Sequence, residues 1–193
     1  MSEWKCFNEG LPPVIVTGLS INYCEGKIYS STYGRGAWSS DLLPPNGTSF
    51  VNVGSINGEV WSNDTILTQS IKVIGGTKLT INNATIRVMA GLKIVVDQGG
   101  ELVLNNTTIT NDCGAFWSGI EVWGNSAAVN NTQYCTSGPC LTGKMTMNGS
   151  RLENAENAVA LWNPLDWNMR GGMIFAENSW FLWLLKTIAV QEI

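Results

Sequence analysis

The sequence predicts an all-β protein whose larger part is a parallel β-helix, a solenoid of stacked turns that each carry short strands. A repeated segment, paired asparagines at matching points of the repeat and a low charge content predict it. Residues 75–86 and 99–109 both run from Gly-Gly through an alternating strand to Asn-Asn and a final Ile. The two copies are offset by about one turn of a stacked-repeat architecture. Charged residues make up only 13% of the chain, about half the usual globular share.

Further copies of the repeat follow along the chain. Residues 144–152 keep the alternation, the polar turn and the final apolar residue, and residues 173–180 form a fainter copy. Between them and the first copies, residues 117–124 alternate apolar and polar side chains at the period of a half-buried strand. We interpret this segment as another turn of the solenoid, with an insertion at its end.

Asparagine suits the corners of such a solenoid, because its side chain bonds to nearby backbone and it tolerates left-handed dihedral angles. A short strand cannot bury its apolar face alone, so we expect stacked turns to join Ile81, Leu104 and Met147 into one interior column. The alternative is that the Asn-Asn pairs mark hairpin turns of an antiparallel sandwich. The similarity of whole turns favours the solenoid.

The N-terminal part follows a different pattern. Residues 14–16 and 28–33 alternate in the manner of strands, and Glu25-Gly26 between them is a turn signal. Pro44-Pro45-Asn46-Gly47 then interrupts the pattern, because prolines and glycine fit neither a helix nor a central strand. The sequence predicts a two-stranded unit over 1–43, a linker over 44–59 and the solenoid over 60–193.

The first unit resembles the closing blade of a β-propeller of the sialidase-like, sortilin-like or photosystem-assembly-factor-like kind. The resemblance is carried by Leu11-Pro12-Pro13-Val14, by Ile28-Tyr29 and above all by Thr32-Tyr33-Gly34-Arg35-Gly36-Ala37-Trp38. It implies that residues 1–43 are a partial blade. The Asp-box turn that often accompanies such blades does not occur in this sequence.

The second unit resembles the right-handed parallel β-helix regions of large secreted proteins of Bacteroidetes-type bacteria, many of which are exported by the type IX system. Residues 117–124, 143–147 and 152–159 follow in the order that those proteins show. The resemblance implies an extracellular or cell-surface location and further domains in a longer parent chain. The apolar run 180–185 departs from the family pattern, so we expect the solenoid to be capped or truncated there.

Charge and composition exclude several classes of partner and chemistry. The net charge of -4 and the lack of clustered Lys and Arg argue against nucleic acid. No basic amphipathic helix is evident, and the run 180–185 is too short to span a bilayer. Without histidine there is no Ser-His-Asp triad and no two-histidine metal motif. We expect no cofactor, no metal and no catalytic residue in this segment.

Glu121, Trp117 and Trp123 form the first candidate site. Indoles on either side of a carboxylate suit a face that stacks on pyranose rings and accepts hydroxyl protons. The alternative is that Glu121 faces water while the tryptophans pack inside, as strand alternation allows. Trp162 and Trp167 form the second candidate, since they lie in a segment that resembles a projecting loop, where function concentrates. Its alternative is an aromatic plug under that loop.

Cys113, Cys135 and Cys140 bracket the insertion over residues 125–139. If the protein is secreted, a disulfide across this loop would restrict its unfolded ensemble. The five cysteines cannot all pair within one chain. The alternative is a three-thiolate metal site, although structural zinc usually takes four ligands.

The leading functional hypothesis is a non-catalytic structural, adhesive or carbohydrate-contacting segment whose partner is a polysaccharide or a cell-surface glycan. A polysaccharide lyase or glycoside hydrolase of the β-helix type is the first alternative, but the acidic residues are scattered and form no close Asp-Asp pair. An ice-binding solenoid is the second alternative. Its candidate residues are Thr80, Thr85, Thr107, Thr108 and Thr110.

Overall fold

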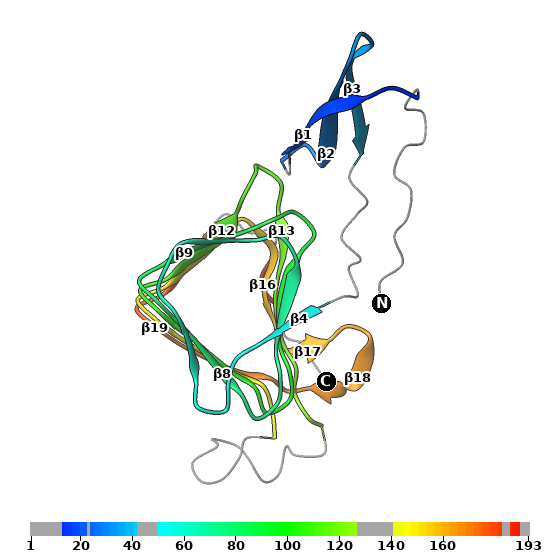
Figure 1. Cartoon of the computed structure of the whole chain (residues 1–193). Helices are drawn as coiled ribbons and strands as arrows, with labels where there is room; N and C mark the ends of the chain where they lie inside the picture. The colour runs from blue at the N-terminus through cyan, green and yellow to red at the C-terminus, as the bar shows by residue number, and fades with distance from the viewer. Residues whose placement is uncertain (1–12, 23, 42–49, 127–140, 183–185, 190–193) are drawn as a thin grey trace. The chain divides into compact units, whose positions relative to one another are not determined.

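The computed structural model describes residues 13–22, 24–41, 50–126, 141–182 and 186–189, the side chains of the last range excepted. The chain divides into two compact units, Met1–Pro44 and Pro45–Ile193. Within the described ranges the elements are β-strands joined by turns and bends (Figure 1). None of these residues belongs to a helix long and apolar enough to cross a membrane. The all-β prediction is confirmed.

The N-terminal unit is a three-stranded antiparallel sheet in the order β1-β2-β3. Its strands are β1 (Val16–Asn22), β2 (Lys27–Thr32) and β3 (Gly36–Asp41). The prediction of two strands is therefore wrong, because Gly34 and Gly36 adopt positive φ angles of 74° and 79° and reverse the chain after Thr32. The segment that was expected to finish the blade instead turns and then pairs with β2 along its full length.

The second unit is a parallel β-helix built from three sheets, and the prediction of this fold is confirmed. Every pairing between neighbouring strands of these sheets is parallel. Sheet I contains β4 (Phe50–Val53), β7 (Ser70–Val73), β10 (Lys93–Val96), β13 (Trp117–Val122), β16 (Ala155–Ala160) and β21 (Lys186–Ala189). Sheet II contains β5 (Glu59–Trp61), β8 (Lys78–Asn82), β11 (Glu101–Asn105), β14 (Lys144–Asn148) and β19 (Met173–Glu177). Sheet III contains β6 (Thr65–Leu67), β9 (Thr85–Val88), β12 (Thr108–Asn111), β15 (Arg151–Glu153) and β20 (Trp180–Leu182).

One turn of the solenoid, called a rung below, passes through sheets I, II and III in that order. The first rung is β4-β5-β6 and the fifth is β16-β19-β20, while β21 stands in sheet I at the position of a sixth. The predicted linker over 44–59 was too long, because Val51 and Val53 pair in register with Ile71 and Val73 and so belong to the solenoid. Residues 42–49 of that linker lie outside the described part of the chain.

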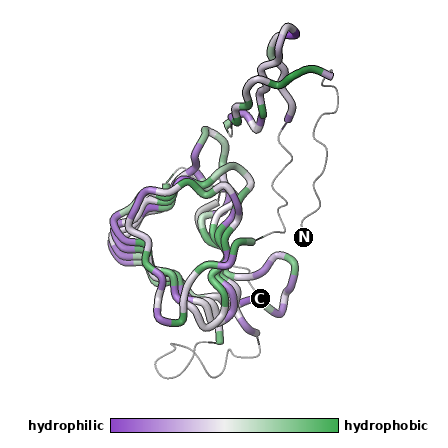
Figure 2. Tube along the Cα trace, viewed as in Figure 1, coloured by the Kyte–Doolittle hydropathy of each residue, from purple (hydrophilic) through white to green (hydrophobic). Residues whose placement is uncertain are grey.

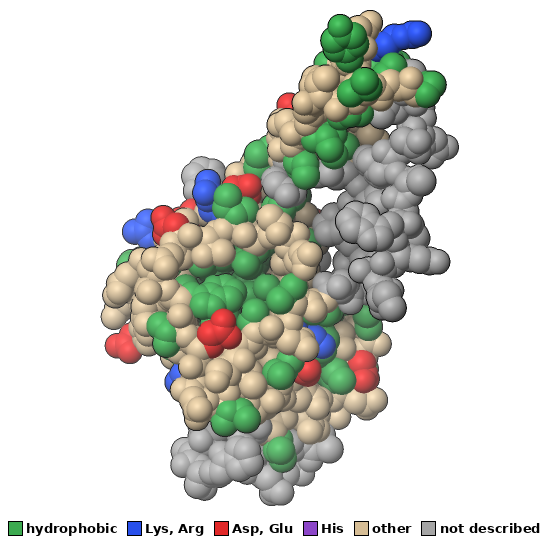
Figure 3. All heavy atoms as spheres, in the orientation of Figure 1, with side chains coloured by type: hydrophobic (Ala, Val, Ile, Leu, Met, Phe, Trp, Pro, Cys, Tyr) green, Lys and Arg blue, Asp and Glu red, His purple; other side chains and the backbone are tan. Residues whose placement is uncertain are grey.

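The core is a set of apolar columns that run from rung to rung. Ile81, Leu104 and Met147 pair in register and are fully buried, which confirms the predicted interior column. In sheet III the equivalent column is Ile86, Ile109 and Leu152. Hydrophobic and hydrophilic residues alternate along the stacked turns (Figure 2), and hydrophobic side chains occupy the centre of the solenoid seen end-on (Figure 3). Burying each large side chain contributes about 1.5–3 kcal/mol.

The corner between sheets II and III is made by residues in the left-handed conformation. Asn83, Asn106 and Asn178 have φ angles of 51°, 47° and 48°, and Gly149 takes the same place with 60°. Just before this corner, the Asn105 side chain donates to Asn82 Oδ1 at 2.8 Å, and that of Asn148 donates to Asn105 Oδ1 at 3.0 Å. The prediction of an asparagine ladder is confirmed.

Both long connections of the solenoid leave from one corner, the one between sheets I and II. In the fourth rung it carries residues 123–143, of which 127–140 lie outside the described ranges. In the fifth rung it carries a hairpin of β17 (Trp162–Asn163) and β18 (Asp166–Arg170), which projects beside the solenoid (Figure 1). Successive rungs therefore place their insertions on the same edge.

Candidate ligand-contacting corner

The backbone conformation of Gly119 in β13 decides which side chains of this strand reach the surface. The register with β16 also shifts here, since Gly119 pairs with Asn157 and Ile120 with Val159, which leaves Ala158 of β16 as the extra residue. Gly119 has a φ of 104°, and a Cβ at this position would lie 1.5 Å from the carbonyl oxygen of Asn157, so no other residue fits here. As a result Trp117 and Ile120 both pack into the core. Strict alternation would have placed them on opposite faces.

The break in alternation at Gly119 separates the residues of the first candidate site. Trp117 is fully buried, and its Nε1 donates to the carbonyl oxygen of Glu153 at 2.8 Å. The hypothesis that Trp117 joins Glu121 and Trp123 on one sugar-binding face is therefore wrong for Trp117. Its indole is a core side chain, as the alternative interpretation proposed.

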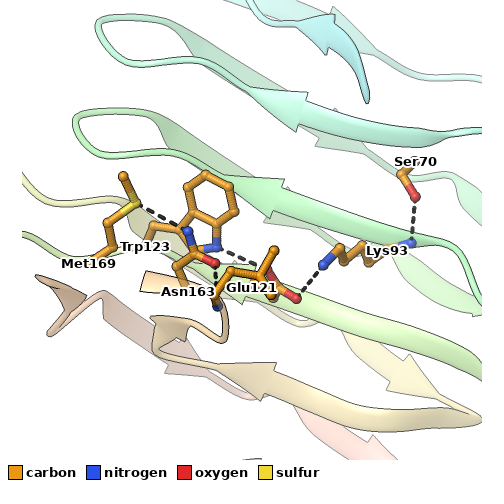
Figure 4. A network of polar contacts seen from close by, with 7 residues as sticks. Ser70, Lys93, Glu121, Trp123, Asn163 and Met169 are labelled. Atoms are coloured by element: carbon orange, nitrogen blue, oxygen red, sulfur yellow. Dashed lines mark hydrogen bonds and ion pairs between the residues drawn. The ribbon is translucent and has the colours of Figure 1, made fainter. Parts of the chain in front are cut away.

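Glu121 lies on the outer side of sheet I, where both of its carboxylate oxygens are engaged (Figure 4). Lys93 Nζ donates to Oε1 at 2.7 Å, and Trp123 Nε1 donates to Oε2 at 2.9 Å. The backbone N–H of Lys93 donates in turn to Ser70 Oγ at 3.2 Å. Glu121 is nearly buried. A carboxylate held in this way positions its neighbours, and each of its oxygens already accepts one hydrogen bond in a nearly buried place.

Trp123 is covered from the side of sheet I as well. Lys72 Nζ lies 4.3 Å from the centroid of the Trp123 ring and 5.1 Å from that of Phe50. Its ammonium group also pairs with Asp97 Oδ2 at 3.7 Å. Because two lysines, two carboxylates and two aromatic rings satisfy one another here, this cluster anchors the corner and leaves little of Trp123 for a ligand.

The β17–β18 hairpin is fixed to the solenoid by its own polar side chains and by backbone bonds. Asn163 accepts a hydrogen bond from the backbone of Leu165 at 3.0 Å and donates to Met169 Sδ at 3.3 Å. Gly124 in the fourth rung donates its backbone N–H to the Met169 carbonyl at 3.1 Å. Gln98 in the third rung donates to the Gly124 carbonyl at 2.7 Å. The fourth rung thus holds the base of the hairpin directly, and the third rung holds Gly124 in place.

The hairpin presents Trp167 to solvent. Its side chain is 44% exposed, and the guanidinium of Arg170 lies 5.1 Å from its ring centroid. Arg170 Nη1 also donates to the Trp167 carbonyl at 3.3 Å, so the cation is held over one face of the ring. Leu165 at the tip is 90% exposed. Trp162 is half-buried at the base, where it pairs with Arg170 in the strand register.

This arrangement combines an exposed indole with a fixed cation and the nearby acidic side chain of Asp166. Such a set suits stacking on a ring together with hydrogen bonds to hydroxyl or acidic groups. Sequence reasoning found Trp162 and Trp167 but missed Arg170 and Leu165. The Asn-Pro-Leu-Asp turn between the two tryptophans was the signal that indicates a tight hairpin, and pairing across it brings Arg170 beside them.

Of the three candidate cysteines, Cys113 lies within the described residues. Cys113 follows β12 and is disulfide-bonded. Cys135 and Cys140 lie outside the described residues, so the predicted bridge across the insertion stays a prediction.

No protein-family model matches the chain, and no curated protein or solved structure matches it significantly.

Proposed function

We propose that this chain is a non-catalytic segment of a larger secreted or cell-surface bacterial protein, and that it contacts carbohydrate through the β17–β18 hairpin. One observation carries the proposal: Trp167 is a half-exposed indole held against Arg170 on a projecting hairpin whose base is bonded to the fourth rung at Gly124. Large aromatic side chains in a pre-organised position bind at low entropic cost. A polysaccharide or cell-surface glycan is the partner that this chemistry favours.

The bonding of Glu121 supports the non-catalytic part of the proposal. An acid–base or nucleophilic carboxylate must reach the substrate. Glu121 instead accepts from Lys93 and Trp123 with its two oxygens. No observation in the described residues favours the lyase or hydrolase alternative over the binding one.

The outer faces of the solenoid do not favour an ice-binding function. Thr107 is buried, and its Oγ1 donates to the Ile81 carbonyl at 2.9 Å, so it faces inward. On sheet II, Thr80 and Thr146 share a row with Val103. The neighbouring row is charged, with Glu101 bonded to lysines on both sides. A flat ladder of threonines is not formed there.

The secreted location is supported by two features. Disulfide bonds such as that of Cys113 persist mainly in oxidising compartments. The resemblance of residues 60–193 to solenoids exported by the type IX system points to the same location and to a bacterial source.

The test is a printed array of microbial and plant polysaccharides, followed by titration of the retained ones. We expect Trp167→Ala to weaken binding at least about tenfold, equivalent to about 1.4 kcal/mol. Trp180→Ala is the matched control, since Trp180 is 49% exposed and stacks on Arg151 at 5.3 Å, but lies on sheet III away from the hairpin. Polysaccharide binding by Trp180→Ala should equal that of the wild type.

Two results would overturn the proposal. Equal polysaccharide binding by the wild type and by Trp167→Ala would show that the hairpin is not the binding site. Release of sugar fragments from a retained polysaccharide by the purified wild type would favour the lyase or hydrolase alternative instead.

A further inference from the structure

The described lysine and arginine side chains of the second unit fall into two groups, those that pair with a carboxylate and those that do not. In the first group the nitrogen–oxygen distances are 2.7–3.7 Å, and its members are Lys72, Lys78, Arg87, Lys93 and Lys144. The second group is Arg151 and Arg170. Their guanidinium groups lie 5.3 and 5.1 Å from the ring centroids of Trp180 and Trp167, two exposed tryptophans. Each of these two cations therefore lies beside an exposed indole and forms no ion pair with a described residue.

The charge of Arg151 is balanced on its own strand. Arg151 and Glu153 are two residues apart in β15, with the fully buried Leu152 between them. Alternation along a strand therefore places both charged side chains on the outer side of sheet III. This face presents a cation and an anion together.

The charge of Arg170 has no such neighbour within the hairpin. The one acidic residue between Trp162 and Arg170 is Asp166, which begins β18, whereas Arg170 ends it. Asp166 Oδ1 accepts the backbone N–H of Asn168 at 3.0 Å, so this carboxylate is engaged with its own turn. The residue opposite Arg170 in the strand register is the uncharged Trp162. The hairpin therefore combines an exposed indole with a positive charge that is not compensated beside it.

The backbone between Trp167 and Arg170 is fixed to the fourth rung. The carbonyl oxygens of Asn168 and Met169 accept N–H groups of the connection that follows β13, at 3.0 and 3.1 Å. The indole and the guanidinium thus stand at the two ends of a bonded segment. Because this segment is ordered before a ligand arrives, less conformational entropy is lost on binding.

Most of the N–H groups of Arg170 are available to a ligand. A guanidinium group carries five donors in a planar fork. Within the described residues, the bond from Nη1 to the Trp167 carbonyl is the one hydrogen bond of this side chain. The fork matches the two oxygens of a carboxylate, and such charge-assisted pairs are about twice as strong as bonds between neutral groups. A carboxylate is therefore a better partner for Arg170 than a sugar hydroxyl.

We infer that the glycan bound by the β17–β18 hairpin is acidic and carries a carboxylate on its pyranose ring, as a uronic acid does. The inference rests on the proposed function, because it names the class of sugar that the same site takes. The ring stacks on the exposed part of Trp167, and the carboxylate accepts from the free N–H groups of Arg170. The chain has a net charge of -4, so the field of the whole protein does not attract a polyanion. A preference for the acidic form must therefore come from a local cation.

Alginate and hyaluronan test the inference, each beside its fully methyl-esterified form, which has the same backbone without the carboxylate charge. For at least one of them, calorimetric titration of the full chain should show at least about tenfold tighter binding of the acid than of its ester. Arg170→Gln should abolish this preference. Arg170→Lys should keep part of it, because an ammonium group retains the charge but lacks the planar fork. Arg151→Gln is the matched control and should keep the whole preference, since Arg151 also lies over a tryptophan but outside the hairpin.

A salt series keeps the test decisive if Arg170→Gln disturbs the hairpin and weakens binding of both forms. In the wild type, the ratio of the two affinities should fall toward one as the salt concentration is raised to about 1 M, where the screening length is about 3 Å. A ratio that does not change with salt would overturn the inference.

Failure of this inference and failure of the proposed function give different results. Equal binding of acid and ester, or a preference that Arg170→Gln retains, would overturn the inference and leave the proposed function in place as long as Trp167→Ala weakens binding. Binding of neutral polysaccharides alone through Trp167 would have the same meaning. If Trp167→Ala weakens the binding of no polysaccharide, the proposed function fails, and the inference fails with it.

Discussion

The side chain of Asn105 donates to Asn82 Oδ1 one rung earlier at 2.8 Å, and the next residue, Asn106, turns the corner with a left-handed φ of 47°. Two adjacent asparagines thus have different structural roles. The first extends an amide ladder along the solenoid, and the second supplies a backbone conformation that few residues tolerate, with only a longer amide contact from Asn106 Nδ2 to Asn83 Oδ1 at 3.4 Å. The division explains why Gly149 replaces the second asparagine in the fourth rung, while Asn148 keeps the first position.

This division predicts different outcomes for two substitutions at Asn106. Asn106→Ala should lower the free energy of unfolding by about 1–2 kcal/mol, since alanine pays the steric cost of the left-handed region. Asn106→Gly should lower it less, because glycine adopts this conformation freely. Urea denaturation of both variants measures the difference. Equal losses would show that the amide contact, not the backbone, matters at this position.

The Lys93–Glu121 pair predicts a coupled loss of stability. Lys93→Met leaves a carboxylate unpaired in a nearly buried place and should cost about 1–3 kcal/mol. Adding Glu121→Gln should recover part of this loss, because the neutral amide still accepts from Trp123. A double-mutant cycle from thermal or urea unfolding measures the coupling.

Lys144→Met provides the matched control. Its side chain and that of its partner Glu101 are 29% and 31% exposed, against 23% and 11% for Lys93 and Glu121. A more exposed pair contributes about 0–1 kcal/mol. If both lysine variants lose the same free energy, the network at Glu121 is not the anchor described above.

Substitutions of Trp117 and of Trp167 should differ in their effect on the free energy of unfolding. Trp117→Phe removes the hydrogen bond to the Glu153 carbonyl and leaves a void in the core, so it should cost about 2–4 kcal/mol in unfolding free energy. Trp167→Ala should change stability by less than about 1 kcal/mol, as expected of a surface position. Differential scanning calorimetry measures both. A Trp117→Phe protein as stable as the wild type would contradict the burial of Trp117 in the core.

Alkaline pH should weaken the N-terminal sheet. The hydrogen bond from Tyr29 Oη to the Glu25 carboxylate raises the pKa of Tyr29, and the hydrogen bond to Asp41 raises the pKa of Lys27. A group whose pKa is raised by folding contributes its stabilisation below its unfolded pKa and loses it as the pH rises through the folded pKa. The loss is therefore expected above about pH 10, the ordinary pKa of both groups.

Phenolate absorbance measures this directly. The difference between the wild type and Tyr29→Phe isolates Tyr29, which should titrate above the ordinary tyrosine value. Glu25→Gln should move it back toward that value. An unchanged titration in Glu25→Gln would contradict the assigned cause.

The interior columns were predictable because strand alternation and equal spacing place Ile81, Leu104 and Met147 at equivalent points of the repeat. The side of Trp117 was not predictable by the same rule, since the positive φ of Gly119, 104°, breaks the alternation within β13. The start of the solenoid was missed because its first strand lacks the repeat's signature. The strand at Phe50–Val53 shows no Asn corner, and only its pairing with β7 identifies it.

The candidate site was predictable in its residues but not in its contacts. Trp162 and Trp167 stand out in the sequence as aromatic residues around a turn. Lys93 and Glu121 lie 28 residues apart, and their approach depends on the register between two rungs. No local pattern encodes that register, because it follows from the length of everything between them.

The sequence by itself determined the fold class, the corner asparagines and the apolar columns, because each of these depends on a short pattern that recurs with every turn. Only the tertiary structure decided which carboxylate is engaged and which tryptophan is buried. Those properties arise where side chains from different rungs meet, and stacking brings together residues that the chain keeps far apart.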